Sequence, residues 1–427
     1  PRSHGSLHHA HRLVTSEEIQ MPPQTVTVDS APHVPDAVRA YFPDELALQL
    51  SSLRRDLHRN PELSWHENRT SELLASTLES FGVTEITRVA GTGLVARVPG
   101  RDRTAPVVAL RGDIDALPIR EDTGLPFSSE NDGVMHACGH DVHASWAVAA
   151  TRLLLESPAH GDVLVVFQPA EEVGEGARAI LASGALDSVR AIFGGHVDRR
   201  FEVGQIVAQE GALAASTDTF RITITGAGSH GARPHESRDP IVGAGALIGA
   251  LQTIVSRQLD PAKPGVVTVG TINGGSAPNI IPDSVQLSGT IRATTSETRA
   301  LLTGEVQRIA QSIAATYGLT ADVTLKGGTP PIVNPAIGAH WARDAVTHVL
   351  GADALVPLGT TNMGGEDFAE YIQKIPGCFM RIGAREKGGR VIAAHSPAYY
   401  ASEDALFIGA AVLAECARVA SESLAAK

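Results

Sequence analysis

The sequence predicts an α/β protein: a mixed-sheet catalytic domain with helices on both faces, plus an inserted ferredoxin-like (βαββαβ) α+β domain. Three observations favour this fold. The chain has 427 residues, which is long for one hydrophobic core. Short apolar runs alternate with amphipathic helical segments towards both ends of the chain. Between them, strands alternate apolar and polar residues, as half-buried strands do.

The first part of the catalytic domain is expected at residues 43–215. Leucines at helical spacing from Leu46 to Leu57 predict an opening helix, which stops before Pro61. Further helices are expected at 67–81 and 142–156, and buried strands at 93–98, 106–110, 162–167 and 191–195. Polar residues follow several of these strands, and α/β folds bind ligands beyond the carboxyl ends of parallel strands.

The inserted domain is expected at residues 216–329 and the second part of the catalytic domain at 330–427. The insert has strands at 219–225, 266–272, 284–293 and 321–326, and helices at 240–257 and 297–317. This β-α-β-β-α-β order is typical of a ferredoxin-like unit. After Pro330 and Pro331, helices at 336–350, 367–375 and 404–424 and a strand at 378–382 return the chain to the first domain.

Charge and cysteine content narrow the possible partners. A net charge of −12 argues against nucleic acid, which is bound by neutralising phosphates. Three cysteines do not form a disulfide framework and suit a reducing compartment, so a cytoplasmic location is expected. No apolar run reaches the roughly 18 residues of a membrane span. Residues 1–42, which carry His4, His8, His9 and His11 near their start and no signal-peptide core, are interpreted as an added tag or a disordered extension.

A Cys-Gly-His sequence is the strongest sign of a metal site. Only Gly139 separates Cys138 from His140, so thiolate and imidazole can converge in a tight loop. The alternative is a buried cysteine beside a helix-capping His-Asp pair. His136 and His143 are interpreted as supporting residues, because the space around two metal ions is limited.

Two adjacent glutamates follow the strand at 162–167. Neighbours in an extended segment point in opposite directions, so one of Glu171 and Glu172 can bind a metal ion while the other serves as a base. The alternative is a pair of solvated loop residues. His196 and His395 also lie at a strand end and in a loop. A mixed set of sulfur, nitrogen and oxygen donors suits Zn²⁺, Mn²⁺, Co²⁺ or Ni²⁺ rather than Mg²⁺ or Ca²⁺.

The inserted domain contains its own polar residues at turns and strand ends. Arg292 offers a bidentate fork for a carboxylate. Asn279 and His230 could donate hydrogen bonds to an oxyanion. The simpler interpretation is that all three are turn or surface residues.

Seven motifs together resemble the two-metal amidohydrolase family of aminoacylases and carboxypeptidases. The similar branch is that of hippurate hydrolases and indole-acetyl-amino-acid hydrolases. The motifs are LHRNPE (57–62), RGDIDALP (111–118), HACGHD (136–141), QPAEE (168–172), NIIPD (279–283), GGEDF (364–368) and HSP (395–397). In related branches a histidine at the position of Asp113 is a ligand. Here the residue is aspartate, and the cysteine of the HACGHD motif fits the branch that lacks that histidine. Asp113 is therefore left out of the ligand set.

The resemblance implies a metal-dependent amidohydrolase with two divalent ions, with Zn²⁺ or Mn²⁺ favoured. The implied ligands are Cys138, His140, Glu172, His196 and His395. Glu171 would be the general base, and His230, Asn279 and Arg292 would act on the substrate. The inserted domain would make a homodimer or higher oligomer, with His230 serving its own or the partner's site.

The implied substrate is a small N-acyl or N-aroyl amino acid, split into a carboxylic acid and a free amino acid. A dipeptidase, carboxypeptidase or amide-detoxifying hydrolase would use the same residues. A non-catalytic metal-binding protein is the alternative from another class, although every implied ligand and Glu171 is present. A serine hydrolase is disfavoured because no G-x-S-x-G elbow is found.

Overall fold

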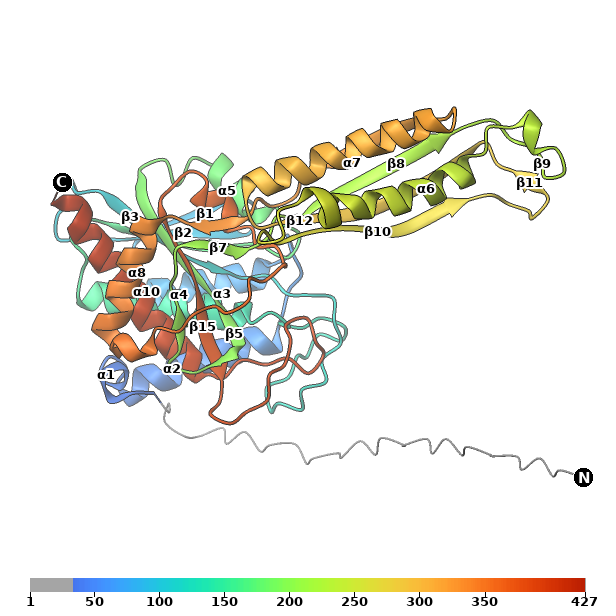
Figure 1. The fold of residues 1–427 in the computed structure, drawn as a ribbon. Coiled ribbons are helices and arrows are strands. Elements are labelled where there is room, and N and C mark those ends of the chain that lie inside the picture. The colour runs from blue at the N-terminus through green and yellow to red at the C-terminus, as the bar shows by residue number, and fades with distance from the viewer. Residues whose placement is uncertain (1–33, 427) are drawn as a thin grey trace, which may run out of the picture.

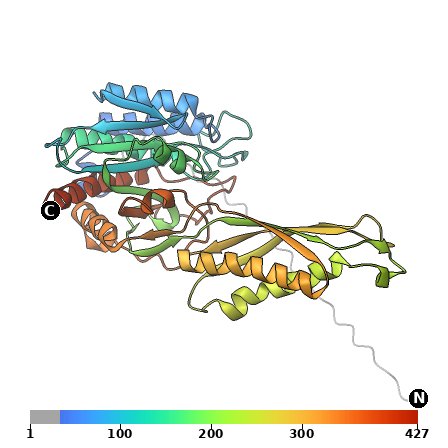
Figure 2. The same cartoon turned by 90° about the horizontal axis from the view of Figure 1, so that it is seen from above.

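The computed structural model describes residues 34–426 and shows an α/β body from which a long second domain projects (Figure 1, Figure 2). The body combines the segments before and after the insert. The catalytic-domain prediction of a mixed sheet with helices on both faces is confirmed.

The central sheet has seven strands in the order β1-β2-β4-β3-β5-β15-β6. Their bounds are β1 Glu85–Val89, β2 Gly93–Val98, β3 Val107–Asp113, β4 Val163–Gln168, β5 Val189–Glu202, β6 Ile206–Val207 and β15 Gly377–Arg385. Strands β4, β3, β5 and β15 run parallel, whereas β1, β2 and β6 pair antiparallel at the edges. Strands β3 and β4 at the centre are fully buried, as expected where both faces are covered.

Ten α-helices complete the described part of the chain. They are α1 Asp36–Arg39, α2 Asp44–Arg59, α3 Asn68–Ser80, α4 His140–Glu156, α5 Gly176–Ala182, α6 Pro240–Thr253, α7 Ser296–Thr316, α8 Ala336–Leu350, α9 Ala369–Ile372 and α10 Asp404–Ala425. The larger core places α2, α3, α4, α8 and α10 on one face of the sheet. The smaller core places α5 and α9 on the other.

The inserted domain is a four-stranded antiparallel sheet, β10-β12-β8-β13, covered on one side by α6 and α7. Its strands are β8 Asp218–Thr225, β10 Gly265–Gly274, β12 Ser284–Ala293 and β13 Thr320–Lys326. This order is that of a ferredoxin-like unit, which confirms the prediction. Two further short pairs are β7 Gly211–Ala214 with β14 Ile332–Asn334, and β9 Ser229–His230 with β11 Ile280–Ile281.

Two neighbouring chain crossings connect the domains. The backbone N of Thr217 donates to the carbonyl of Thr329 at 3.0 Å, and their hydroxyls lie 2.9 Å apart. The backbone N of Ser216 donates to the carbonyl of Ala293 at 2.7 Å. The two crossings are therefore joined to each other and to the end of β12.

One described helix, Pro240–Gln258, is long and apolar enough, by length and composition, to cross a membrane. It consists of α6 and a following π-helical turn, Ile254–Gln258. Leu247 and Leu251 pack into the core of the inserted domain, whereas Ile241 and Val242 are exposed. The absence of a membrane partner stays a prediction.

Several boundaries differ from those predicted. Strand β5 continues to Glu202 because β15 pairs with it beyond the end of β3, so His196 lies within a strand and not after one. Helix α4 already begins at His140, and α9 covers only part of the expected 367–375.

Folded structure begins before residue 43, which corrects the proposed end of the N-terminal extension. Helix α1 packs against α8 and α10, and Val38 and Phe42 are fully buried. The Phe42 ring meets Phe407 edge to face, with centroids 5.1 Å apart. The earlier part of the extension, residues 1–33, lies outside the described residues.

Replacing Phe42 by alanine should lower the free energy of unfolding by about 3–5 kcal/mol, the usual cost of removing a buried phenyl ring. Replacing the neighbouring Tyr41, which is 40% exposed, should change it by roughly 0.5 kcal/mol or less. Urea unfolding followed by circular dichroism measures both. Equal effects of the two substitutions would show that Phe42 is not part of the core.

Candidate metal centre

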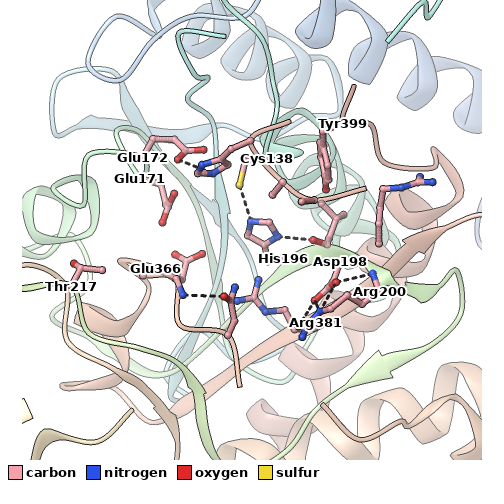
Figure 3. Close-up of a pocket in the computed structure, with 18 of the residues that line it drawn as sticks. Cys138, Glu171, Glu172, His196, Asp198, Arg200, Thr217, Glu366, Arg381 and Tyr399 are labelled. Atoms are coloured by element: carbon pink, nitrogen blue, oxygen red, sulfur yellow. Dashed lines mark hydrogen bonds and ion pairs between the residues drawn. The ribbon is translucent and has the colours of Figure 1, made fainter. Parts of the chain in front are cut away.

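The five implied metal ligands lie along one edge of the central sheet, in a cavity of about 790 Å³ (Figure 3). Cys138 and His140 come from the start of α4, Glu172 from the loop after β4, His196 from β5 and His395 from the loop before α10. His140 lies deepest, with its ring fully buried, and the other four line the cavity. The structure therefore brings together segments that lie far apart in the sequence.

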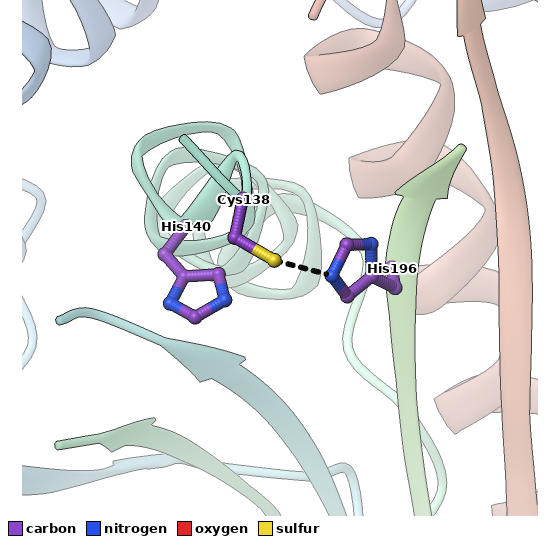
Figure 4. Close-up of side chains that lie close together, drawn as sticks. All are labelled: Cys138, His140 and His196. Carbon is purple, nitrogen blue, oxygen red and sulfur yellow. Dashed lines mark hydrogen bonds between the residues drawn. The ribbon is translucent and has the colours of Figure 1, made fainter. Parts of the chain in front are cut away.

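The turn between Cys138 and His140 depends on glycine. Gly139 has φ +87°, and a Cβ there would lie 2.4 Å from the Val197 side chain. This turn places the Cys138 thiol 3.1 Å from His196 Nε2 (Figure 4). Glycine thus permits both the left-handed backbone and the close approach of α4 to β5.

Both buried histidines are oriented by hydrogen bonds at Nδ1. His140 Nδ1 donates to the carbonyl of Asp115 at 2.9 Å, with the Asp115 carboxylate at 3.3 Å. His196 Nδ1 donates to the carbonyl of Val197 at 2.6 Å. These bonds leave Nε2 of each ring as an electron-pair donor facing the cluster, the usual arrangement of metal-binding histidines, with His196 Nε2 beside the Cys138 thiol and His140 Nε2 without a hydrogen-bond partner.

Glu172 and His395 form the solvent side of the cluster. The Glu172 backbone N donates to Asp115 at 3.0 Å, and His395 Nε2 lies 3.4 Å from the Glu172 carboxylate. His395 has φ +65°, which is uncommon for a residue with a side chain. Its backbone N donates to the carbonyl of Ala137 at 2.8 Å, which ties this loop to the Cys138 turn.

The chemistry of the buried donor atoms fits divalent cations. His140 Nε2 and Glu172 Oε1 are buried without hydrogen-bond partners, 3.8 Å apart. Burial and the nearby Glu172 charge hold the pKa of the Cys138 thiol well above its usual range. Burial raises the pKa of Glu172 to about 7, although His140 opposes this shift. Acidic groups forced together in this way need a positive charge to ionise.

The neighbouring aspartates support the cluster. Asp115 orients His140 through its backbone carbonyl and its carboxylate. Asp113 accepts from His143 Nδ1 at 2.6 Å and from Arg111. His143 Nε2 in turn accepts from the backbone N of Val197 at 3.0 Å, so both its nitrogens are occupied, and its supporting role stays a prediction that these contacts favour.

Glu171 occupies a different environment from Glu172. It faces Glu366 and Asp367, and the Asp367 backbone N donates to its carboxylate at 3.4 Å. Burial, then the charges of Glu366 and Glu172, hold the pKa of Glu171 well above its usual range. The two adjacent glutamates therefore have partly different surroundings, although they lie in a turn at residues 171–174 and not in the extended segment that the sequence predicted.

No role was predicted for Glu366 and Arg381, although both line the cavity. Glu366 belongs to the GGEDF motif, so its place in a shared motif was a usable signal. Arg381 lies within the apolar strand β15, where nothing in the sequence distinguishes it.

The inserted-domain residues divide into two groups. Arg292 lines the cavity, near the point where β12 returns to the body. His230 and Asn279 are exposed and lie in and beside the β9–β11 pair, at the far end of the inserted domain (Figure 1, Figure 2). The expectation that they act at the metal cluster is therefore not met within one chain.

A buried Cys/His/Glu cluster beside a second glutamate, at the edge of a mixed α/β sheet, defines a metal-dependent hydrolase. The chain belongs to the peptidase family M20/M25/M40, whose model matches residues 109–419. This finding agrees with the family resemblance seen in the sequence motifs.

Individual relatives support the same assignment. N-acetyl-L-cysteine deacetylase of Bacillus subtilis (strain 168) is 40% identical over 375 residues, covering 87% of this chain and 88% of the relative. IAA-amino acid hydrolase ILR1-like 2 of Arabidopsis thaliana is 39% identical, covering 86% and 83%. The crystal structure of a dinuclear metal-binding peptidase from Bacillus subtilis superposes with a TM-score of 0.78 at 37% identity, covering 88% and 98%.

Replacing His140 by alanine should reduce the metal content of the purified protein, because its Nε2 is a buried donor with no other partner. Elemental analysis after metal loading and desalting measures this content. His340→Ala is the matched control, since this side chain is 60% exposed on α8. Unchanged metal content in His140→Ala, with the circular dichroism spectrum preserved, would remove His140 from the ligand set.

Proposed function

We propose that the protein hydrolyses the amide bond of N-acyl or N-aroyl amino acids, releasing a carboxylic acid and a free amino acid. The observation that carries this proposal is the Glu171–Glu172 pair, one carboxylate among the metal donors and the other facing the same cavity. Relatives named as an N-acetyl-L-cysteine deacetylase and an IAA-amino acid hydrolase support this substrate class.

Cys138, His140, Glu172, His196 and His395 would hold two divalent ions. Zn²⁺ or Mn²⁺ suits this mixture of donors best, and Co²⁺ or Ni²⁺ is also compatible. When bound, such ions polarise the scissile carbonyl and lower the pKa of water. Asp115 keeps His140 aimed at the site, and the bond from His395 to Ala137 holds the last loop in place.

The chain's own residues would move the proton and hold the substrate. Glu171 takes a proton from the attacking water and passes it to the leaving amine, since its carboxylate faces the cavity and not the solvent. Arg292 binds the carboxylate of the amino-acid portion through its planar guanidinium. A dipeptidase or carboxypeptidase reaction would use the same steps, so a panel of acyl-amino acids and dipeptides distinguishes them.

His230 and Asn279 would complete the site of a second copy of the chain. Their place at the tip separates them from their own cluster, so a homodimer formed through the inserted domain would supply them from the partner. Exposed apolar residues of this domain, Ile241, Val242 and Ile272 among them, support such an interface. A cytoplasmic location is proposed on cysteine content, since all three thiols are buried and free.

Glu171→Gln should lower kcat by a factor of about 10³ while metal content stays unchanged, because the amide cannot accept the proton. Steady-state kinetics on an N-acyl amino acid, with elemental analysis, tests both statements. Glu175→Gln makes the same chemical change at an exposed position four residues further on and should leave kcat unchanged. Near-normal turnover by Glu171→Gln would refute its role as the base.

Hybrid dimers test the partner role of His230. His230→Ala and Glu171→Gln chains should each be inactive alone. After co-expression with different tags, a hybrid has one site with both residues intact, so mixed preparations should recover roughly a quarter of normal activity. Recovery requires that His230 acts across subunits. No recovery in purified hybrids would place it in its own chain's site.

A further inference from the structure

Arg381 is a buried cation in the cavity wall that the proposed reaction does not use. It lies on β15 directly opposite His196 of β5 in the parallel ladder, and it is 5% exposed. Among residues 34–426 its guanidinium makes no hydrogen bond or ion pair, and its Nε is buried without a partner. Its one specific contact is the Phe379 ring, whose centroid lies 5.6 Å away.

Two other arginines that line the cavity, Arg199 and Arg200, are neutralised by carboxylates. Arg200 forms a bidentate pair with Asp198, at 2.7–3.1 Å. Arg199 pairs with Glu386 at 3.0 Å. Asp198 is therefore already engaged, although it lies close to Arg381 in the same wall (Figure 3). A buried charge without a partner is costly to keep, so its retention in a binding cavity indicates an anionic ligand.

Arg381 also lies next to the candidate metal donors. His196, its ladder neighbour, points towards the Cys138 thiol and belongs to the set of donors that suits divalent cations. Cations bound there would repel the guanidinium, and an anion beside it would relieve that repulsion. Arg292 is a second arginine without a hydrogen bond or ion pair within the described chain, and it reaches the same cavity from the inserted domain. Two separate anionic groups on one substrate would match this arrangement.

We propose that Arg381 binds a carboxylate on the acyl portion of the substrate, so that the preferred substrates are monoamides of dicarboxylic acids with an amino acid. This inference rests on the proposed function. Arg292 holds the amino-acid carboxylate from one domain, and Arg381 holds the acyl carboxylate from the other. The amide bond lies between them, at the metal donors and Glu171.

Kinetics on two nearly isosteric substrates test this proposal. N-succinyl-L-alanine carries the second carboxylate, and N-succinamyl-L-alanine has a neutral amide in its place. The protein should favour the succinyl compound by about 10- to 100-fold in kcat/KM, the range expected of a charge-assisted, bidentate contact. Arg381→Met should bring this ratio close to one, and Arg381→Lys should keep part of it. Arg385→Met, a paired arginine on the same strand, should leave the ratio unchanged.

A binding measurement separates recognition from catalysis. Calorimetric titration of the metal-loaded protein with succinate and with succinamate reports the effect of the second charge alone. Succinate should bind at least tenfold more tightly, and Arg381→Met should abolish this difference. Because Arg381→Lys keeps the charge, it still reports on the preference if Arg381→Met is misfolded.

The outcomes distinguish the inference from the proposed function. If neither compound nor N-acetyl-L-alanine is hydrolysed, the proposed function fails. If N-acetyl-L-alanine is hydrolysed but succinyl and succinamyl compounds react equally, only the role of Arg381 is overturned. A loss of equal size on all three substrates in Arg381→Met would assign the arginine to the amino-acid carboxylate, which also overturns the inference.

Discussion

Acidic groups buried together at one edge of the central sheet are the constraint on which the structure depends. Glu171, Glu172 and the Cys138 thiol lie in a region where little water reaches their charges, and burial raises the pKa of each. Arg111, fully buried, compensates one side of the cluster through Asp113, Glu366 and Asp367. Bound cations would compensate the other side, so metal binding and folding of this edge are thermodynamically linked.

A second set of ion pairs holds segments from the two ends of the described chain together. Behind the Cys138 turn, Arg54 and His58 of α2 bind Asp141 at 2.9 and 2.8 Å. Arg55 of the same helix binds Glu403 at 2.7 Å, near the start of α10. The loop containing His395 is thus anchored to an N-terminal helix as well as to the turn. The donors keep their positions because three distant segments share one buried polar network.

The sequence predicted those features that depend on local pattern. Helical leucine spacing predicted α2, alternation predicted the inserted sheet, and the Cys-Gly-His spacing predicted the turn around Gly139. Features that depend on tertiary pairing could not be predicted in this way. The length of β5 is determined by its pairing with β15. Phe42 is buried because its ring packs against Phe407. Arg381 has no ion-pair partner because no carboxylate of the described chain faces its guanidinium. The separation of His230 from the cluster follows from the length of the inserted strands.

The two connections at Thr217 and Thr329 are hydrogen-bonded to each other, so a rotation of the inserted domain would have a single hinge at this place. When a domain rotates about a hinge, residues near the hinge move little and residues at the far end of the domain move most. Arg292 lies close to this hinge, so it would stay near the cavity when the inserted domain rotates. The β9–β11 pair at the far end of the domain would instead undergo the largest displacement. Carboxylate capture by Arg292 would therefore tolerate domain rotation, whereas any contribution from His230 would be sensitive to it.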